Sequence, residues 1–71
     1  MTEMQAERTR RVLRRREVEQ RTGLGRSTIY RKIRMGEFPS PIRLGPQTVA
    51  WREEDIEQWL SSRPEARGGA A

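Results

Sequence analysis

The side chains best suited to binding chemistry lie in the segment 26–35, Arg-Ser-Thr-Ile-Tyr-Arg-Lys-Ile-Arg-Met. Ile29 and Ile33 are four residues apart, so they form one apolar stripe if the segment is helical. The other faces carry groups that hydrogen-bond to base edges and phosphate oxygens. Such a helix, preceded by a tight turn, is typical of segments that enter the major groove of DNA. The candidate contact residues on it are Arg26, Ser27, Thr28, Tyr30, Arg31 and Arg34, of which Thr28 is expected mainly to support the first turn.

Two further groups of polar residues are candidates for DNA contact. Arg14, Arg15 and Arg16 precede or open the first predicted helix, where they could lie against backbone phosphates. Solvated surface charge explains this run equally well, so both alternatives stay open. On a predicted hairpin, Arg43 and Gln47 would enter the minor groove or touch its phosphates if the hairpin binds DNA.

The residue types needed for catalysis and metal binding are scarce. The chain has no Cys and no His, which argues against disulfides, a zinc site and His-based acid–base chemistry. Glu53, Glu54 and Asp55 fall in the first turn of a predicted helix, where the helix dipole favours negative charge. The serines have no nearby base to activate them. We therefore expect a protein that is not an enzyme and that needs no cofactor and no metal.

Positive charge is concentrated in one half of the chain. The net charge is +5, but residues 8–34 hold eleven Arg or Lys against two acids, whereas residues 35–71 hold four against six. This distribution indicates a polyanionic partner beside the 26–35 segment. No apolar run approaches the roughly 20 residues that span a bilayer, and no signal peptide is visible. The expected partner is double-stranded DNA rather than a membrane, and the expected location is the cytoplasm, on the nucleoid when DNA is bound.

Glycines mark the ends of two predicted helices. The first helix covers 15–22 and stops at Gly23, and the second covers 26–35 and stops at Gly36. Glycine favours the left-handed conformation that commonly follows a helix. Gly25 occupies the N-cap position of the second helix, where it is acceptable but weaker than Ser or Asp. The spacing predicts a helix–turn–helix unit.

A β-hairpin is predicted after this unit. The runs 42–44 and 49–51 alternate between apolar and other residues around a Gly/Pro turn at 45–48. Strict alternation puts Arg43 on the outside. The same alternation gives an inner face of Ile42, Leu44, Val49 and Trp51.

A last helix over 52–62 completes the predicted fold, which is mainly α with a small β-hairpin, a winged helix-turn-helix. We expect a flexible basic N-terminal arm over 1–11, the DNA-binding domain over 12–62 and a flexible tail over 63–71. The predicted core contains Leu13, Val18, Leu24, Ile29, Ile33, Phe38, Ile42, Leu44, Val49, Trp51, Ile56, Trp59 and Leu60.

Separated blocks of residues also match a known pattern in order. They are Leu13-Arg14-Arg15-Arg16-Glu17-Val18, Thr22-Gly23-Leu24, Arg26-Ser27-Thr28-Ile29-Tyr30-Arg31, Gly36-Glu37-Phe38-Pro39, Pro41-Ile42, Leu44-Gly45, Trp51-Arg52-Glu53 and Ile56-Glu57-Gln58-Trp59-Leu60. This pattern resembles the AlpA family of small phage and prophage transcriptional regulators, which are similar to excisionases and to the MerR-type winged helix. Two positions depart from it: Gly25 stands where the family usually has Ser, and Gln47 where its hairpin turn often has a basic residue. The resemblance implies sequence-specific DNA binding.

Three functions remain open from the sequence. The first is a sequence-specific transcriptional regulator, of phage or prophage origin, that contacts the major groove through helix 26–35. The alternative is an excisionase-like architectural factor, a recombination directionality factor that bends DNA and contacts an integrase. A third is an adaptor whose basic face meets an acidic protein. RNA polymerase or an integrase would be the protein partner in the first two cases.

The expected oligomeric state follows from what the sequence lacks. MerR-type regulators dimerise through a long C-terminal coiled coil, and the residues after the predicted last helix, ending in Arg-Gly-Gly-Ala-Ala, cannot form one. We expect a monomer in solution that binds DNA cooperatively at paired or repeated sites. A weak dimer through the N-terminal arm is the alternative.

Overall fold

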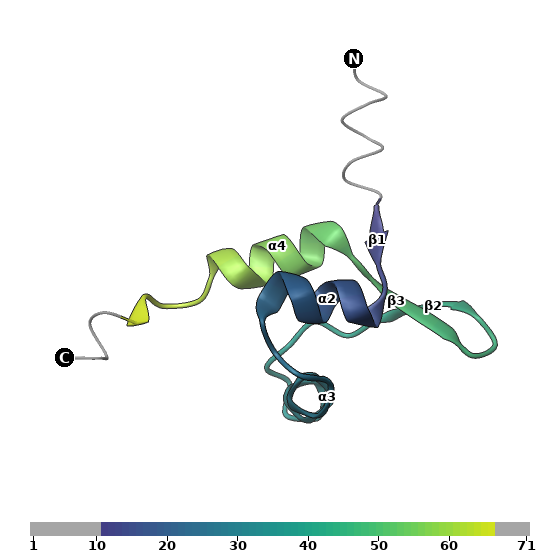
Figure 1. The fold of residues 1–71 in the computed structure, drawn as a ribbon, viewed down its shortest axis with the longest axis horizontal. Coiled ribbons are helices and arrows are strands. Elements are labelled where there is room, and N and C mark those ends of the chain that lie inside the picture. The colour runs from purple at the N-terminus through teal and green to yellow at the C-terminus, as the bar shows by residue number, and fades with distance from the viewer. Residues whose placement is uncertain (1–10, 67–71) are drawn as a thin grey trace, which may run out of the picture.

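The computed structural model describes residues 11–66 of the 71-residue chain. The helices lie beside a small antiparallel sheet, and α2 is placed between α3 and α4 in Figure 1. The predicted basic arm over 1–11, except Arg11, and most of the predicted tail over 63–71 lie outside the described residues. The elements, in chain order, are β1 (Val12–Leu13), α2 (Arg15–Thr22), α3 (Arg26–Arg34), β2 (Ile42–Gly45), β3 (Thr48–Arg52) and α4 (Glu53–Ser61).

The turn between α2 and α3 is built by local hydrogen bonds. Gly23 has a φ of 77°, and its N–H donates to the carbonyl oxygen of Glu19 at 2.7 Å. The Thr22 hydroxyl donates to the Val18 carbonyl at 2.8 Å and accepts the Leu24 N–H at 3.2 Å. These bonds satisfy backbone groups that the end of α2 would otherwise leave without partners. The predicted bounds of α2 and the predicted stop at Gly23 are confirmed.

The sheet has three strands rather than the predicted two. Its order is β1-β3-β2, all antiparallel, with Leu13 opposite Trp51. The N–H of Glu53 also donates to the Arg11 carbonyl at 2.9 Å. A strand of two residues is too short to show the alternation by which strands are recognised in a sequence. The pairing makes β3 the central strand and fixes the chain just before α2.

The predicted inner face of the hairpin is wrong. Ile42 lies opposite Ala50 and Arg43 opposite Val49, so Ile42 and Val49 are on different faces of the sheet. The register then shifts between Arg43 and Gly45 in a β-bulge. Leu44 is the extra residue there and is 50% exposed instead of buried.

The core lies where the sheet meets the helices. Ala50 and Trp51 are consecutive in β3 and both have 0% exposure, so both faces of this strand are covered. The buried cluster draws on β1, α2, α3, the connector, β3 and α4. Its members are Leu13, Val18, Ile29, Phe38, Trp51 and Ile56, with Leu24, Tyr30, Ile33, Trp59 and Leu60 packed against it.

The two tryptophans fix the connector between α3 and β2. The indole N–H of Trp51 donates to the Pro39 carbonyl at 2.9 Å, and that of Trp59 donates to the Glu37 carbonyl at 2.8 Å. Phe38 lies between Glu37 and Pro39 in the sequence and is buried. Its ring packs edge-to-face on Trp59, with ring centroids 4.7 Å apart. Buried indole N–H groups usually require such acceptors. These contacts fix the connector although it has no regular secondary structure. They thereby help to fix the position of α3, which precedes it.

Candidate nucleic-acid interface

Helix α3 presents its cations outward. Ile29 is fully buried and Ile33 packs against the core, so the opposite side of the helix faces solvent. Among residues 11–66, no salt bridge to Arg26, Arg31 or Arg34 is found. These three guanidinium groups are exposed and available to an anionic partner. Ser27 is exposed as well, and Thr28 is half-buried near the helix start.

A groove brings together predicted residues from three separate segments. It has a volume of about 360 Å³ and lies between the start of α2, the side of α3 and the turn of the β2–β3 hairpin. In Figure 1, α3 lies below α2 and the hairpin extends to the right of the start of α2. The lining residues are Arg14, Arg15, Arg16, Tyr30, Gln47 and Val49. Five of the six are residues that the sequence assigned to DNA contact, although they span more than thirty positions of the chain.

Tyr30 connects this groove to the core. Its ring lies 6.4 Å from the Trp51 ring, centroid to centroid, at an angle of 58°. The residue is half-buried and also lines the groove. The Tyr30 ring therefore packs against the hairpin, through Trp51 of β3. A contact between its hydroxyl and a phosphate stays a prediction.

The three arginines at the start of α2 are not equivalent. Arg15 is half-buried and forms a salt bridge with Glu19 one turn later. Arg14 and Arg16 are exposed, and no carboxylate within the described part of the chain pairs with either. The N–H of Arg14 donates to the Glu17 carboxylate at 2.9 Å, which caps the helix. Arg14 and Arg16 are consequently the free charges of this run.

The two predicted contact residues of the hairpin, Gln47 and Arg43, have different surroundings. Gln47 is exposed and lies at the groove. Arg43 is exposed too, but its Nη1 donates to the Pro46 carbonyl at 2.8 Å, so its guanidinium is folded back on the turn. The structure thus brings Gln47 to the other candidates and gives Arg43 a role in bracing the hairpin.

Two acidic residues of α4, Glu53 and Glu57, form salt bridges with α2. Arg21 of α2 forms salt bridges with Glu53, at 3.0 Å, and with Glu57. The hydrogen bond to Glu53 is the largest of the effects that raise the pKa of the Arg21 guanidinium above its ordinary value. These carboxylates therefore join α4 to α2. No group of three potential metal ligands occurs among residues 11–66, and none of the helices there is long and apolar enough to cross a membrane.

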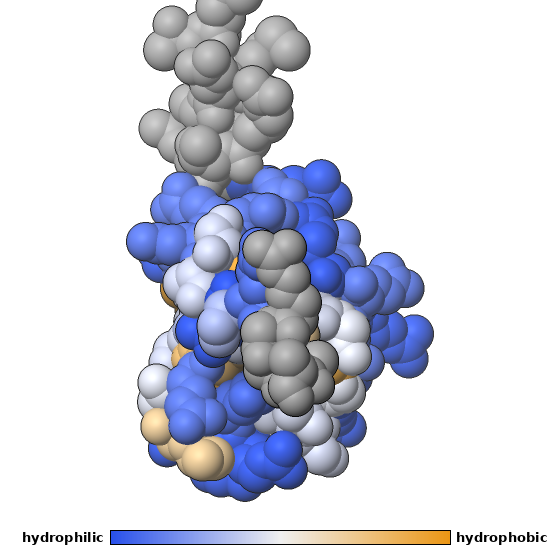
Figure 2. Space-filling view, turned by 90° about the vertical axis from the view of Figure 1, so that its left-hand side faces the viewer, coloured by the Kyte–Doolittle hydropathy of each residue, from blue (hydrophilic) through white to orange (hydrophobic). Residues whose placement is uncertain are grey.

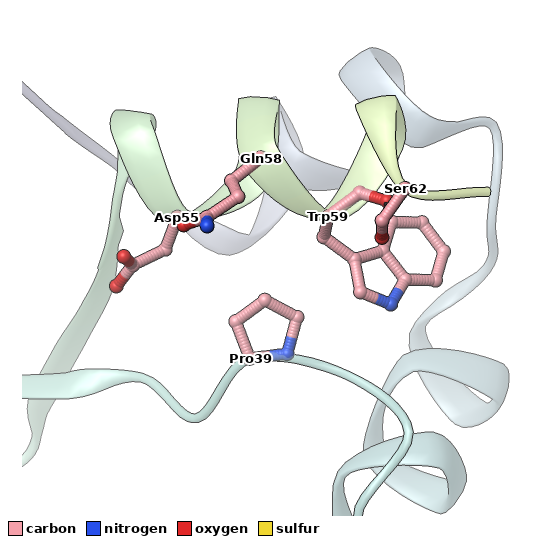
Figure 3. Close-up of a pocket in the computed structure, with 5 residues that line it drawn as sticks. All are labelled: Pro39, Asp55, Gln58, Trp59 and Ser62. Carbon is pink, nitrogen blue, oxygen red and sulfur yellow. Dashed lines mark hydrogen bonds between the residues drawn. The ribbon is translucent and has the colours of Figure 1, made fainter.

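A second hollow lies on another side of the molecule, beneath α4 (Figure 3). Pro39 of the connector forms its floor, and Trp59 stands at one end. The remaining lining residues are Asp55, Gln58 and Ser62, so no Arg or Lys contributes to it. Its composition does not suit a polyanion. Figure 2 shows a neighbouring face that is mostly hydrophilic, with small apolar areas.

The fold and the basic groove define a small domain of the helix–turn–helix type. The sequence profile of the family described as "Prophage CP4-57 regulatory protein (AlpA)" matches residues 11–64. The chain belongs to the AlpA family, as the separated blocks of its sequence predicted.

Two curated relatives support this assignment. The chain is 47% identical over 47 residues to "Uncharacterized protein ORF88" of Enterobacteria phage P4, covering 66% of this chain and 53% of that protein. It is 39% identical over 59 residues to "DNA-binding transcriptional activator AlpA" of Escherichia coli strain K12, covering 75% of this chain and 84% of the relative. The chain thus spans about half the length of the phage P4 relative and most of the length of the bacterial one.

Proposed function

We propose that this protein is a sequence-specific transcriptional regulator of phage or prophage origin that binds double-stranded DNA. Helix α3 lies in the major groove, and the β2–β3 hairpin serves as a wing against the neighbouring backbone. The observation that carries the proposal is the basic groove, in which the start of α2, the side of α3 and the hairpin turn converge. A relative described as a DNA-binding transcriptional activator supports it.

The residues divide into two roles within this proposal. The exposed residues Arg26 and Ser27 open α3, and Arg31 follows Ser27 by one turn. These three contact base edges, because the N-terminal part of such a helix reaches the bases. Arg14 and Arg16 contact phosphates and fix the orientation of the domain, which carries no sequence information by itself. Tyr30 and Gln47 line the groove together with Arg14 and Arg16 and contact phosphates as well.

A tiled binding experiment tests the proposal. Labelled duplexes from the neighbourhood of the gene are titrated with the full chain, each against a scrambled duplex of the same composition, at two salt concentrations. Fluorescence anisotropy of the label reports binding. One fragment that binds far more tightly than its scramble, and retains this preference at the higher salt, supports a sequence-specific regulator. Equal binding to every fragment, or none, contradicts it.

The same experiment separates the regulator from an excision factor. A single short site near a promoter fits a regulator that acts with RNA polymerase. Several tandem sites near an attachment sequence fit an architectural factor that acts with an integrase. Footprints on the preferred fragment distinguish these patterns.

We further propose that the free protein is a monomer. The large hydrophobic residues exposed among residues 11–66 are Met35, which follows α3, and Leu44 of β2. Stable association requires a contiguous apolar patch, which two separated side chains do not form. Sedimentation that shows a tight dimer without DNA would contradict this, whereas cooperative binding to paired sites agrees with it.

A further inference from the structure

Leu44 is an apolar side chain in a place that the core does not explain. It is 50% exposed and occupies the bulge of β2, next to the turn of the hairpin. Because the bulge inserts one extra residue, Leu44 has no partner on β3. Exposed leucines are common singly, so exposure alone indicates nothing. What matters is the surroundings of this one.

The hairpin turn next to Leu44 lies at the rim of the basic groove. Gln47 belongs to this turn and lines the groove together with Tyr30 and the arginines of α2. A duplex bound by α3 and by these arginines therefore passes close to the hairpin. In the sequence, only Gly45 stands between Leu44 and the turn residues Pro46 and Gln47.

The hairpin carries two arginines, Arg43 and Arg52, and no acid. Arg43 donates to the Pro46 carbonyl at 2.8 Å and is held against the turn. Between Phe38 and Arg52 the sequence contains no Asp or Glu, so nothing in the hairpin repels a polyanion. A hairpin without acids can approach a duplex, and Leu44 is its exposed large hydrophobic side chain.

We propose that Leu44 inserts into the minor groove beside the major-groove segment that α3 occupies, and that it wedges open a base step there. Apolar side chains such as Leu are used in this way by minor-groove proteins, which kink the duplex as they partly unstack it. Flexible pyrimidine–purine steps require the least energy to deform, so we expect one of them at the contact. This inference rests on the proposed function and adds an apolar, deforming contact to it.

The test compares two leucine-sized residues with similar exposure. Met35 at the end of α3 is 59% exposed and is the matched control. Leu44→Ser, Leu44→Met and Met35→Ser are each titrated with the duplex that the unmodified chain binds best. Energy transfer between dyes at the two duplex ends reports bending, and 2-aminopurine placed at successive steps reports unstacking.

The expected result is specific to Leu44. Leu44→Ser lowers affinity by about five- to tenfold, the amount expected from the apolar surface still exposed on this side chain, and abolishes both the bend and the 2-aminopurine signal. Leu44→Met keeps both, and Met35→Ser behaves as the unmodified chain. Thermal unfolding of all three variants stays within a few degrees of the original, since neither residue is in the core.

Two results would overturn the inference, and they are distinguishable. If Leu44→Ser binds and bends DNA as the unmodified chain does, the wedge is wrong while the proposed function stands. If the unmodified chain binds no duplex with preference, the proposed function fails and the wedge fails with it.

Discussion

Arg31 is the residue on which sequence preference is expected to depend most. It is exposed on α3, one turn after Ser27, and no carboxylate among the described residues neutralises it. An arginine in this position is suited to two hydrogen bonds with one guanine. Arg31→Ala should therefore lose about 1–3 kcal/mol of binding free energy on the preferred duplex and little on a scrambled one.

Arg63 provides the matched control for this measurement. It is also an exposed arginine, but its guanidinium stacks over the Trp59 ring at 4.6 Å and does not line the groove. Arg63→Ala removes the same charge and should leave the ratio of preferred to scrambled binding unchanged. Equal losses on both duplexes for Arg31→Ala would show that Arg31 contacts only phosphate.

Tyr30 allows the hydroxyl contact to be separated from the packing. Its ring lies against Trp51, and Phe in its place preserves that contact. Tyr30→Phe should weaken binding to all duplexes equally, by about 0.5–1.5 kcal/mol, because one hydrogen bond is lost. The melting temperature should not change. A melting temperature lowered by many degrees would mean that the hydroxyl serves the fold instead.

At the scale of elements, the turn between α2 and α3 depends on one backbone conformation. A Cβ at Gly23 would meet no atom within 4 Å, but the φ of 77° is unfavourable for any residue with a side chain. Gly23→Ala should therefore destabilise the fold by about 1–2 kcal/mol, the cost of the left-handed conformation. Urea unfolding followed by circular dichroism measures it.

At Gly25, two residues later, we expect a side chain to stabilise the fold rather than to destabilise it. A Cβ there also meets no atom within 4 Å, but its φ is −82° and it is the N-cap of α3 without a side-chain cap. Gly25→Ser should stabilise the fold by a few tenths of a kcal/mol, since a hydroxyl can then accept an N–H of the first turn. Destabilisation by Gly25→Ser would show that this position does not tolerate a side chain for reasons other than φ.

The sequence was informative where a local rule determines structure. The predicted helices at 15–22 and 26–35 agree with α2 and α3 to within one residue, because Gly23 and Gly36 mark positions with positive φ. Five of the six residues that line the groove were among the predicted contact residues, and their contact with DNA stays a prediction.

Features that depend on pairing between distant strands could not be predicted. The strand β1 has two residues, and its partner lies almost forty positions away. The bulge at Leu44 shifts the register without any Gly or Pro at the extra residue to mark it. The contact between Arg43 and the Pro46 carbonyl likewise depends on the exact course of the turn. Each of these is set by tertiary geometry, which a local alternation of residue types does not contain.

At the scale of the whole molecule, charge is divided between two sides. Arg14 and Arg16 line the groove and the α3 arginines are exposed on the helix that forms one of its sides, whereas Glu53 and Glu57 of α4 are paired with Arg21. Binding should therefore weaken steeply with salt, as counterions leave the DNA. Arg16→Gln should lower affinity on all duplexes alike and reduce the salt slope by about one.

Arg15→Gln is the comparison within the same run. Glu19 already neutralises Arg15, so its replacement should change the slope less than Arg16→Gln does. Titrations at four or more salt concentrations measure both slopes. An unchanged slope for Arg16→Gln would place the start of α2 outside the interface.

The pair of indole hydrogen bonds that holds the connector gives the protein a built-in optical signal. The chain has two tryptophans, and both donate to the backbone of the segment 37–39. Release of this segment would break both hydrogen bonds and expose more of both indoles to water, which would shift their intrinsic emission to longer wavelength. The emission maximum therefore follows one structural event, the seating of the connector that positions α3, and it does so without any added label.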